Sequence, residues 1–406
     1  MTYHNNLQRQ SKKKNILFIL FAIALFLQML RSQNAWFLWD VTINASTNIA
    51  LLTGVAYFYY STEKRYLKTF MPAYMFFVLA ILWNSNFSPL LLYLIQLPLL
   101  LVLLLTDREK QILLGWWTNL YAIILLVSLT AWLLTWFTSI PSYGELKFRE
   151  SYTYTNYLFC IKSLINDIRF NAIFLEPGHT AMIAAFTVCA NRFNFSNKAV
   201  VIILLCTIAT FSLAGYLLLA IGYLLHILLE NRKKMWKRGV IFAALLALGY
   251  YAAVTYNGGD NLVNTLILER LEYDEEIGIS GNNRTGQKTD DAFDEIVDSG
   301  EALSGITHAK YTLYEKTDYI QGAGYKLYIM RKGIIGTALM FLFYFLVYRR
   351  SANKKEMFGM LIIYISAFWQ RAYPEWQVWL YIYVFMTTTP IRYNAQKGLR
   401  PKPVSF

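Results

Sequence analysis

The chain has 406 residues, of which 56% are apolar, 17% aromatic and only 16% charged, and its formal net charge is +13. Its mean hydropathy of +0.35 excludes an ordinary soluble globular protein, because one core could not bury so much apolar surface, and it indicates a polytopic membrane protein. The positive charge is scattered between apolar segments, which favours membrane orientation and contact with anionic headgroups over a nucleic-acid surface.

Twelve apolar segments follow one another, with lengths near those that cross a hydrocarbon core as a helix. They are residues 15–32, 41–60, 69–86, 88–105, 112–137, 177–191, 199–211, 213–229, 238–256, 328–348, 357–373 and 375–389. The run from Ala199 to Leu229 permits one long helix or two short ones, and basic residues on both flanks favour a hairpin. We therefore expect one all-α integral membrane domain over residues 1–406, with about twelve transmembrane helices.

Basic residues set the expected orientation. The short segments 9–14, 61–68, 106–110, 192–198, 230–238, 349–355 and 390–402 hold 24 of the 38 Lys and Arg residues. The positive-inside rule makes these segments cytoplasmic, and with them both termini. The first apolar segment resembles a secretory signal but lacks a cleavage site, so we expect a retained span.

Motifs for common cofactors are absent from the sequence. Cys189 and Cys206 lie inside apolar segments and Cys160 stands alone, so neither a disulfide framework nor a metal-ligand spacing is present. No P-loop, dinucleotide-binding glycine pattern or long-period repeat occurs.

Two longer segments, residues 138–176 and 257–327, interrupt the pattern, and both are expected on the outer face. Functional residues tend to lie on such loops. The second loop is acidic: 14 of the 25 carboxylates in the chain lie between Asp260 and Asp318. Most of these acids form a solvated surface, so its few basic residues are the more informative ones.

Glu176-Pro177-Gly178-His179 lies where the sixth apolar segment begins. Proline is favoured in the first helical turn, which places Glu176 near the N-cap and His179 about one turn into the helix. The positive end of this helix would favour a nearby anion. One interpretation is an acid–base pair at the outer face; the alternative is that Glu176 only caps the helix.

Several short motifs occur in a characteristic order. They are Phe174-Leu-Glu-Pro-Gly-His179 at the start of a span, Ser212-Leu-Ala-Gly215 in the hairpin, the large outer loop, and Gly322-Ala-Gly-Tyr325 followed by Gly333-Ile-Ile-Gly336. Together they resemble the Wzy-type oligosaccharide repeat-unit polymerases of O-antigen and capsule synthesis, which are related to the O-antigen ligases. The resemblance covers roughly residues 110 to 350.

This chain departs from the family pattern in places. Relatives often carry an arginine after the hairpin serine, where this chain has Leu213. They also have an Arg-x15-Gly pattern in the outer loops, and Arg270 to Gly286 and Arg284 to Gly300 both match it.

The resemblance implies transfer of a growing glycan from polyprenyl diphosphate to the non-reducing-end sugar of another lipid-linked unit. This would occur on the outer face of the bacterial plasma membrane, without a cofactor or metal. The partners implied are the lipid-linked oligosaccharide, membrane lipids, a chain-length regulator and a flippase. Two alternatives stay open: a ligase that moves finished glycan to another acceptor, and a transporter or flippase. The unequal outer loops and the absence of repeated halves favour the enzyme over the transporter.

Such chemistry requires a base for the attacking hydroxyl and cations for the diphosphate. We assign Glu176 as the base or as the group that orients the acceptor, and His179 as a hydrogen-bond or proton donor. Arg284, between glycines in the large loop, is our third catalytic candidate. Arg169 and Arg270 are candidates for diphosphate binding, since arginine offers bidentate donors. The structural alternative for Arg169 is an ion pair with Asp167 or a headgroup contact. For Arg270 it is a pair with the flanking acids Glu269 and Glu272 within a helix.

Further basic residues lie around the tenth segment. Lys326, Arg331 and Lys332 would neutralise the lipid diphosphate or reach to headgroups, and His308 is a second acid–base candidate. Three residues of the last hairpin receive structural interpretations. They are Arg371, in an ion pair with Glu375, and Trp376 and Trp379, in an interfacial aromatic belt.

Overall fold

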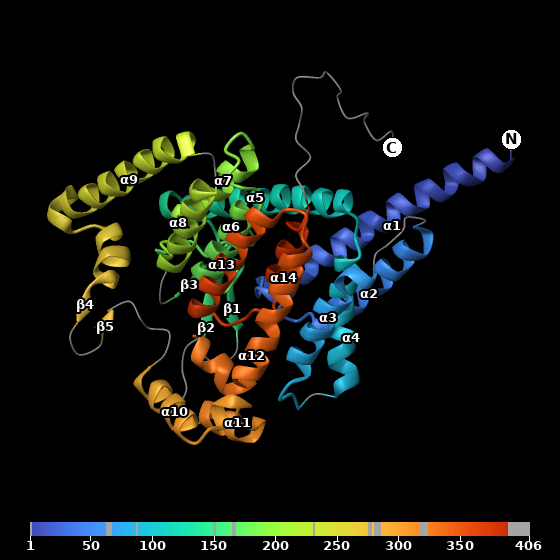
Figure 1. Cartoon of the computed structure of the whole chain (residues 1–406). Coiled ribbons are helices and arrows are strands. Elements are labelled where there is room, and N and C mark those ends of the chain that lie inside the picture. Colours follow the sequence, from blue (N-terminus) through green and yellow to red (C-terminus); the bar gives the residue numbers. More distant parts are fainter. Residues whose placement is uncertain are drawn as a thin grey trace.

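The computed structural model describes residues 2–61, 67–86, 88–148, 152–164, 168–229, 232–274, 278–279, 286–316 and 324–388. The chain is mostly helical, and Figure 1 shows the helices gathered around α6, α13 and α14. Each of the twelve predicted apolar segments overlaps one helix. These helices are α1 (Thr2–Ser32), α2 (Ile43–Tyr60), α3 (Leu67–Leu82), α4 (Pro89–Leu103), α5 (Asp107–Phe137), α6 (Pro177–Ala190), α7 (Lys198–Ile208), α8 (Leu213–Leu228), α9 (Arg232–Thr255), α12 (Tyr325–Arg350), α13 (Lys354–Gln370) and α14 (Gln377–Phe385).

Four stretches among the described residues are long and apolar enough to cross a membrane. They are Ser11–Ser32, Asp107–Phe137, Met235–Gly259 and Tyr325–Arg350, in α1, α5, the α9 region and α12. The α9 stretch is the least covered by the rest of the protein: only 6% of its apolar window is buried. An apolar helix exposed almost all round is typical of contact with lipid.

The predicted hairpin is confirmed. Helix α7 ends at Ile208 and α8 begins at Leu213, so the run is two short helices. Phe211 turns the chain with φ of 44°, and the Ser212 side chain accepts a hydrogen bond of 3.4 Å from the Gly215 backbone N–H. Ser212 is therefore the N-cap of α8, which gives the serine of this motif a structural role.

The first outer loop contains a small antiparallel sheet, so the expectation of an all-α chain is wrong there. Its strands are β1 (Glu145–Phe148), β2 (Tyr152–Asn156) and β3 (Ile161–Ser163), with β2 in the centre. The physical reason is the alternating threonine and tyrosine of β2, since β-branched and aromatic residues favour strands. The central Tyr154 pairs with Leu146 on one side and Ser163 on the other.

The second outer loop includes two helices, α10 (Gln287–Asp298) and α11 (His308–Lys316), joined through the 3-10 turn Glu301–Leu303. This part docks on α12 at Gly333, whose φ is 68°. A Cβ on Gly333 would lie 2.4 Å from the carbonyl carbon of Ser304, so only glycine permits this approach. The Ile306 N–H donates to the Met330 carbonyl at 2.8 Å.

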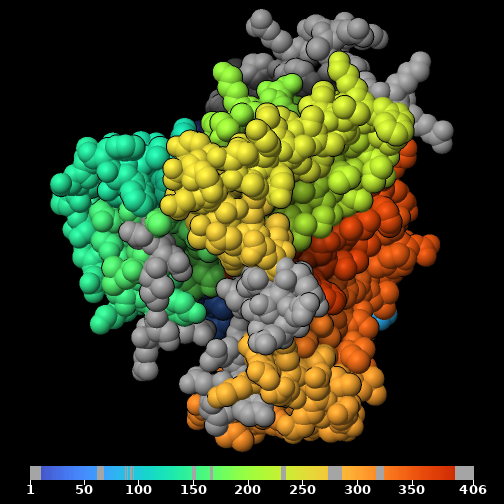
Figure 2. Space-filling view, turned by 90° about the vertical axis from the view of Figure 1, so that its left-hand side faces the viewer, coloured from blue at the N-terminus to red at the C-terminus, as the bar shows by residue number. Residues whose placement is uncertain are grey.

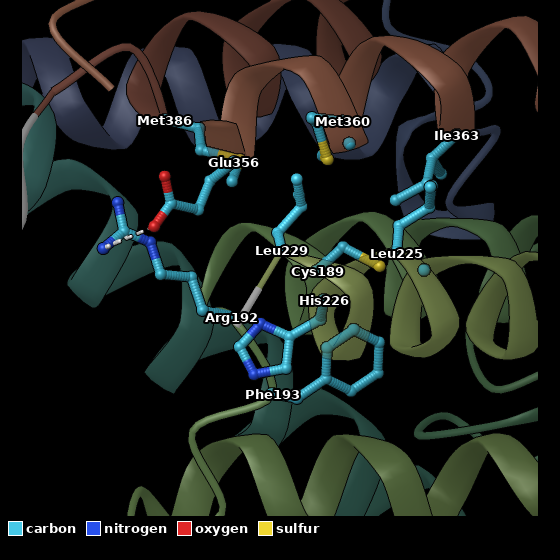
Figure 3. Close-up of a pocket in the computed structure, with 12 residues that line it drawn as sticks. Cys189, Arg192, Phe193, Leu225, His226, Leu229, Glu356, Met360, Ile363 and Met386 are labelled. Atoms are coloured by element: carbon cyan, nitrogen blue, oxygen red, sulfur yellow. Dashed lines mark ion pairs between the residues drawn. The ribbon is translucent and has the colours of Figure 1, made fainter. Parts of the chain in front are cut away.

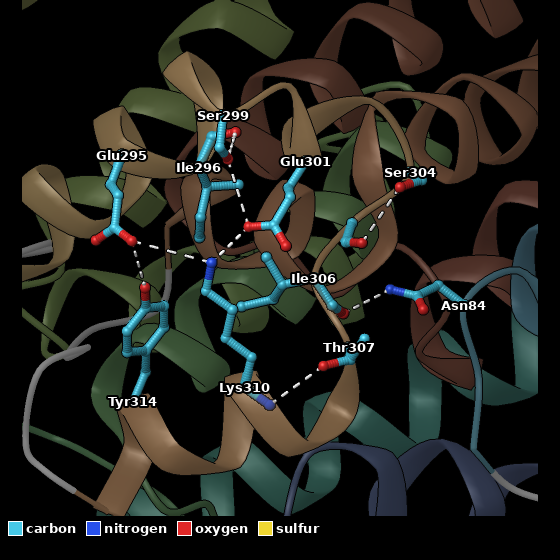
Figure 4. A network of polar contacts seen from close by, with 11 residues as sticks. Asn84, Glu295, Ile296, Ser299, Glu301, Ser304, Ile306, Thr307, Lys310 and Tyr314 are labelled. Atoms are coloured by element: carbon cyan, nitrogen blue, oxygen red, sulfur yellow. Dashed lines mark hydrogen bonds and ion pairs between the residues drawn. The ribbon is translucent and has the colours of Figure 1, made fainter.

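Asn84, which follows α3, holds the same junction. Its Nδ2 donates to the carbonyls of Ile306 and Arg331, each at 2.8 Å, and Figure 4 shows the first of these contacts beside the Lys310 network. Lys310 forms an ion pair with Glu301 within the loop. The second outer loop is thus fixed to α12 by a backbone hydrogen bond and to the end of α3 by the Asn84 side chain.

Helices α6 and α14 form the centre of the protein. Every residue of α6 after Pro177 is buried, and so are residues 378–385 of α14. Helix α8 packs closely on α6, because a Cβ on Gly215 would lie only 2.3 Å from the Ala181 Cβ. Small residues at helix crossings allow such close packing in membrane proteins.

We predict that Gly215→Ala destabilises the protein by about 1–3 kcal/mol, because the added methyl group overlaps Ala181 and forces α6 and α8 apart. The matched control is Gly115→Ala in α5, where nothing lies within 4 Å of the new Cβ. The control should leave stability unchanged or raise it slightly, since alanine is the better helix former. Unfolding in detergent measures both, and equal stability of the two variants would contradict this account of the crossing.

Candidate functional site

Glu176 is the N-cap of α6, as the sequence predicts. Its backbone is extended, and its carbonyl accepts from the N–H groups of His179 and Thr180, at 3.1 and 3.4 Å. Its side chain, however, makes no capping hydrogen bond. The interpretation of Glu176 as a simple helix cap is therefore wrong for its carboxylate, because the carboxylate accepts no hydrogen bond from the N–H groups at the start of α6.

The segment before Glu176 is held by contacts from several elements. Asn171 accepts through its carbonyl from the Thr180 hydroxyl at 2.7 Å, and the Tyr154 hydroxyl donates to the Leu175 carbonyl at 2.8 Å. Burial, and then the negative charge of Glu176, raise the pKa of Tyr154, so its hydroxyl stays protonated and keeps donating. The small sheet therefore positions the start of α6.

The Glu176 carboxylate accepts a hydrogen bond from Nη2 of Arg371, the C-cap residue of α13. The Arg371 side chain is 5% exposed and that of Glu176 is 35% exposed. The expected Arg371–Glu375 pair is wrong: Glu375 pairs instead with Arg331 of α12, at 3.3 Å. The two carboxylates thus take arginines from different helices.

Gly178 provides room for this contact. A Cβ on Gly178 would lie 2.8 Å from Nη2 of Arg371 and 3.3 Å from its Cζ. The guanidinium therefore lies directly against the first turn of α6. This requirement explains a glycine between the proline and the histidine of the motif.

The turn from Arg371 to Trp376 joins α13 to α14 and carries an aromatic pair. The Tyr373 and Trp376 rings stack in parallel, 4.0 Å apart. Trp376 lies edge-on to the His179 imidazole, with ring centroids 5.4 Å apart. His179 is only 3% exposed. Of the predicted acid–base pair Glu176 and His179, Glu176 is therefore the accessible group.

A second arginine, Arg169, lies within electrostatic range of Glu176. Arg169 donates through Nε to the Thr210 carbonyl at 3.2 Å. Burial first, and then the positive charge of Arg270, lower the pKa of the Arg169 guanidinium to about 10, while Glu176 acts in the opposite direction and Arg371 in the same one. At neutral pH Arg169 stays a cation. Asp167, its alternative partner, lies outside the described residues.

Arg270 comes from the second outer loop, within the 3-10 turn Glu269–Leu271. Figure 2 shows this yellow segment on one face of the molecule, between α9 above and the orange α10 and α11 below. Arg169 therefore lies within electrostatic range of Arg270, Arg371 and Glu176, which come from separate parts of the chain. The local charge is positive, which suits an anion.

The remaining predicted residues do not join Glu176 and Arg169. Lys326 pairs with Asp290 at 2.9 Å. Lys332 donates to the carbonyls of Ile81 and Trp83 at the end of α3, each at 2.8 Å, where a cation is favoured by the helix dipole. His308 is exposed at the start of α11. Arg284 lies outside the described residues.

Sequence reasoning missed the role of the turn between α13 and α14. Arg371 stands in an otherwise apolar stretch, and an ionisable residue there is itself a signal of function. Trp379, expected in an interfacial belt, is instead 1% exposed and packs edge-on against Phe186 of α6. Among the described residues, no three His, Cys, Asp or Glu side chains are grouped as a metal ion would require.

Comparison of the chain with protein-family models, with curated proteins and with solved structures finds no match. The geometry of the described residues is therefore the basis for any assignment of function.

We predict strong coupling between Glu176 and Arg371. Glu176→Gln and Arg371→Gln should each destabilise the protein, because each leaves a buried or half-buried partner without its counter-charge. The double variant should cost about 1–3 kcal/mol less than the sum of the two, as measured by unfolding in detergent. The control is the more exposed Glu301–Lys310 pair, for which the same cycle should give less than about 1 kcal/mol. Additive effects at Glu176 and Arg371 would rule out the contact.

Proposed function

We propose that this chain polymerises lipid-linked oligosaccharide repeat units in a membrane. A growing glycan would be transferred from polyprenyl diphosphate to the non-reducing-end sugar of another lipid-linked unit. The single observation that carries the proposal is the positive charge near the head of α6, where Arg371 pairs with the partly exposed carboxylate of Glu176 and Arg169 lies within electrostatic range of Glu176, Arg270 and Arg371. A diphosphate leaving group needs cations, and a sugar hydroxyl needs an oxygen acceptor.

The membrane arrangement belongs to the same proposal. We infer that all twelve apolar helices are embedded in the plasma membrane, with both termini and the basic segments on the cytoplasmic side. Glu176 then lies at the outer end of α6, together with the two longer loops. A substrate held by a lipid tail would reach this end from within the bilayer.

The proposed roles follow from exposure and charge. Arg169 and Arg270 would bind the diphosphate, since neither has a carboxylate as its described hydrogen-bond partner. Arg371 would orient the Glu176 carboxylate through their hydrogen bond. Glu176, with the more exposed side chain, would receive the acceptor hydroxyl. His179, buried beside Trp376, would hold this aromatic turn in place.

In the reaction, the acceptor hydroxyl oxygen attacks the anomeric carbon of the donor sugar. A new glycosidic C–O bond forms, and the bond from the anomeric carbon to the diphosphate oxygen breaks. The electron pair remains on the diphosphate, where Arg169 and Arg270 neutralise it. The hydroxyl proton passes to the Glu176 carboxylate. The polyprenyl diphosphate then diffuses away within the bilayer.

Reconstitution tests the proposal directly. Purified protein in lipid vesicles would receive a polyprenyl-diphosphate-linked repeat unit, with neither nucleotide sugar nor divalent metal. Longer lipid-linked glycans are the expected product. Glycan found only on a different acceptor would indicate a ligase, and movement across the vesicle without chain growth would indicate a transporter; either result would refute the polymerase.

We predict that Arg169→Ala and Arg270→Ala each lower the rate of chain extension by about 10²-fold, since each removes a donor from the developing charge on the diphosphate. Glu176→Gln should lower it at least as much. Lys310→Ala, which alters a cation paired within the outer loop, is the control and should stay near the wild-type rate. Equal rates in all four variants would exclude the arginine cluster as the site.

A further inference from the structure

A second candidate site lies at the other end of α6, remote from Glu176. A cavity of about 180 Å³ opens there between the end of α6, α8 and the start of α13. Since α6 has 14 residues, the two ends of this helix are about 20 Å apart. Figure 3 shows the cavity and the side chains that line it.

Most of the cavity wall consists of apolar, flexible side chains. Its apolar side chains come from α6, α8, α13 and the residue after α14: Cys189, Leu225, Leu229, Met360, Ile363 and Met386. Thioether and branched aliphatic side chains adapt to flexible hydrocarbon. This part of the cavity therefore suits methylene groups, such as the upper part of an acyl chain.

One end of the cavity carries two opposite charges. Arg192 Nη1 lies 3.8 Å from Glu356 Oε1, longer than a hydrogen bond, and the two side chains are 23% and 32% exposed. Figure 3 shows them side by side at the cavity edge. In the amide orientation that satisfies both, Asn353 donates to Glu356 and accepts from Arg192.

The backbone that presents Arg192 is unusual. Arg192 and Phe193 both have positive φ, of 56° and 49°, a region that residues other than glycine rarely adopt. Such strain persists only where surrounding contacts fix it, and it is found at binding sites. Here it directs the guanidinium to the cavity edge, while Phe193 packs against His226, with ring centroids 5.8 Å apart.

The opposite charges of Arg192 and Glu356 determine which lipid headgroup fits the cavity. A purely anionic headgroup would meet Glu356, and a purely cationic one would meet Arg192. A zwitterion can place its phosphate beside Arg192 and its ammonium beside Glu356. The carboxylate only accepts hydrogen bonds, so it favours a primary ammonium, which donates three, over a trimethylammonium group, which donates none.

We propose that this cavity binds a zwitterionic aminophospholipid, phosphatidylethanolamine, with its headgroup across Arg192 and Glu356 and its upper acyl chain among the methionines. Basic residues of the neighbouring segment 192–198 place this end of α6 on the cytoplasmic side, so the lipid comes from the inner leaflet. The bound lipid joins the inner ends of α6, α8 and α13. This inference depends on residence in a membrane, not on glycan transfer.

Native mass spectrometry of the detergent-solubilised full chain tests the proposal. The protein would be offered phosphatidylethanolamine, phosphatidylcholine and phosphatidylglycerol in equal amounts. We expect preferential retention of phosphatidylethanolamine. Glu356→Gln should lower this retention about tenfold, the effect of losing one charge-assisted hydrogen bond, and should abolish the preference over phosphatidylglycerol. Lys355→Gln, at the exposed neighbouring position, is the matched control and should bind as the wild type does.

A cavity-filling variant and a competition measurement complete the test. Leu225→Phe fills the cavity without altering charge, and it should lower retention of phosphatidylethanolamine while thermal unfolding stays near the wild type. Soluble phosphoethanolamine at the same concentration should not displace the lipid, because it lacks the acyl chain. Equal retention of the three lipids, an unchanged preference in Glu356→Gln, or displacement by soluble phosphoethanolamine would each overturn the assignment.

Discussion

The contact between Arg371 and Glu176 joins the two halves of the site. It links the head of the buried helix α6 to the turn between α13 and α14, across 195 residues of sequence. A buried guanidinium is costly without a counter-charge, so the pair fixes both segments at once. The stacked Tyr373 and Trp376 follow in the same turn, and Trp376 then covers His179. Without this ion pair, the aromatic turn would lose its position over α6.

Close backbone approach is the second constraint, and glycine permits it at two contacts. Gly178 lets the Arg371 guanidinium lie against α6, and Gly333 lets the second outer loop lie against α12. The first contact creates the charged site and the second carries the loop that includes Arg270. Packing therefore explains the glycines at positions 178 and 333, because a Cβ at either position would overlap a neighbouring group.

Local signals in the sequence predicted much of the fold. Apolar length predicted the helices, and basic flanks predicted the hairpin before Leu213, because both effects act over a few residues. The partner of Glu176 was not predictable in this way. Arg371 has Glu375 four residues away, the spacing of a local pair, but α13 ends at Gln370 and the helical geometry required for that pair is lost. The choice of partner is a tertiary property.

The charges near Glu176 also limit the roles that these residues can have. A purely structural ion pair needs one cation for each carboxylate, and Arg371 already fulfils that need. Arg169 and Arg270 add like charges, and their mutual repulsion together with burial disfavours the cationic form of Arg169. Such an arrangement is unfavourable by itself, and a bound anion would offset the repulsion between the arginines. Stability alone does not account for this arrangement, and its charge is the kind that the proposed binding of a diphosphate would require.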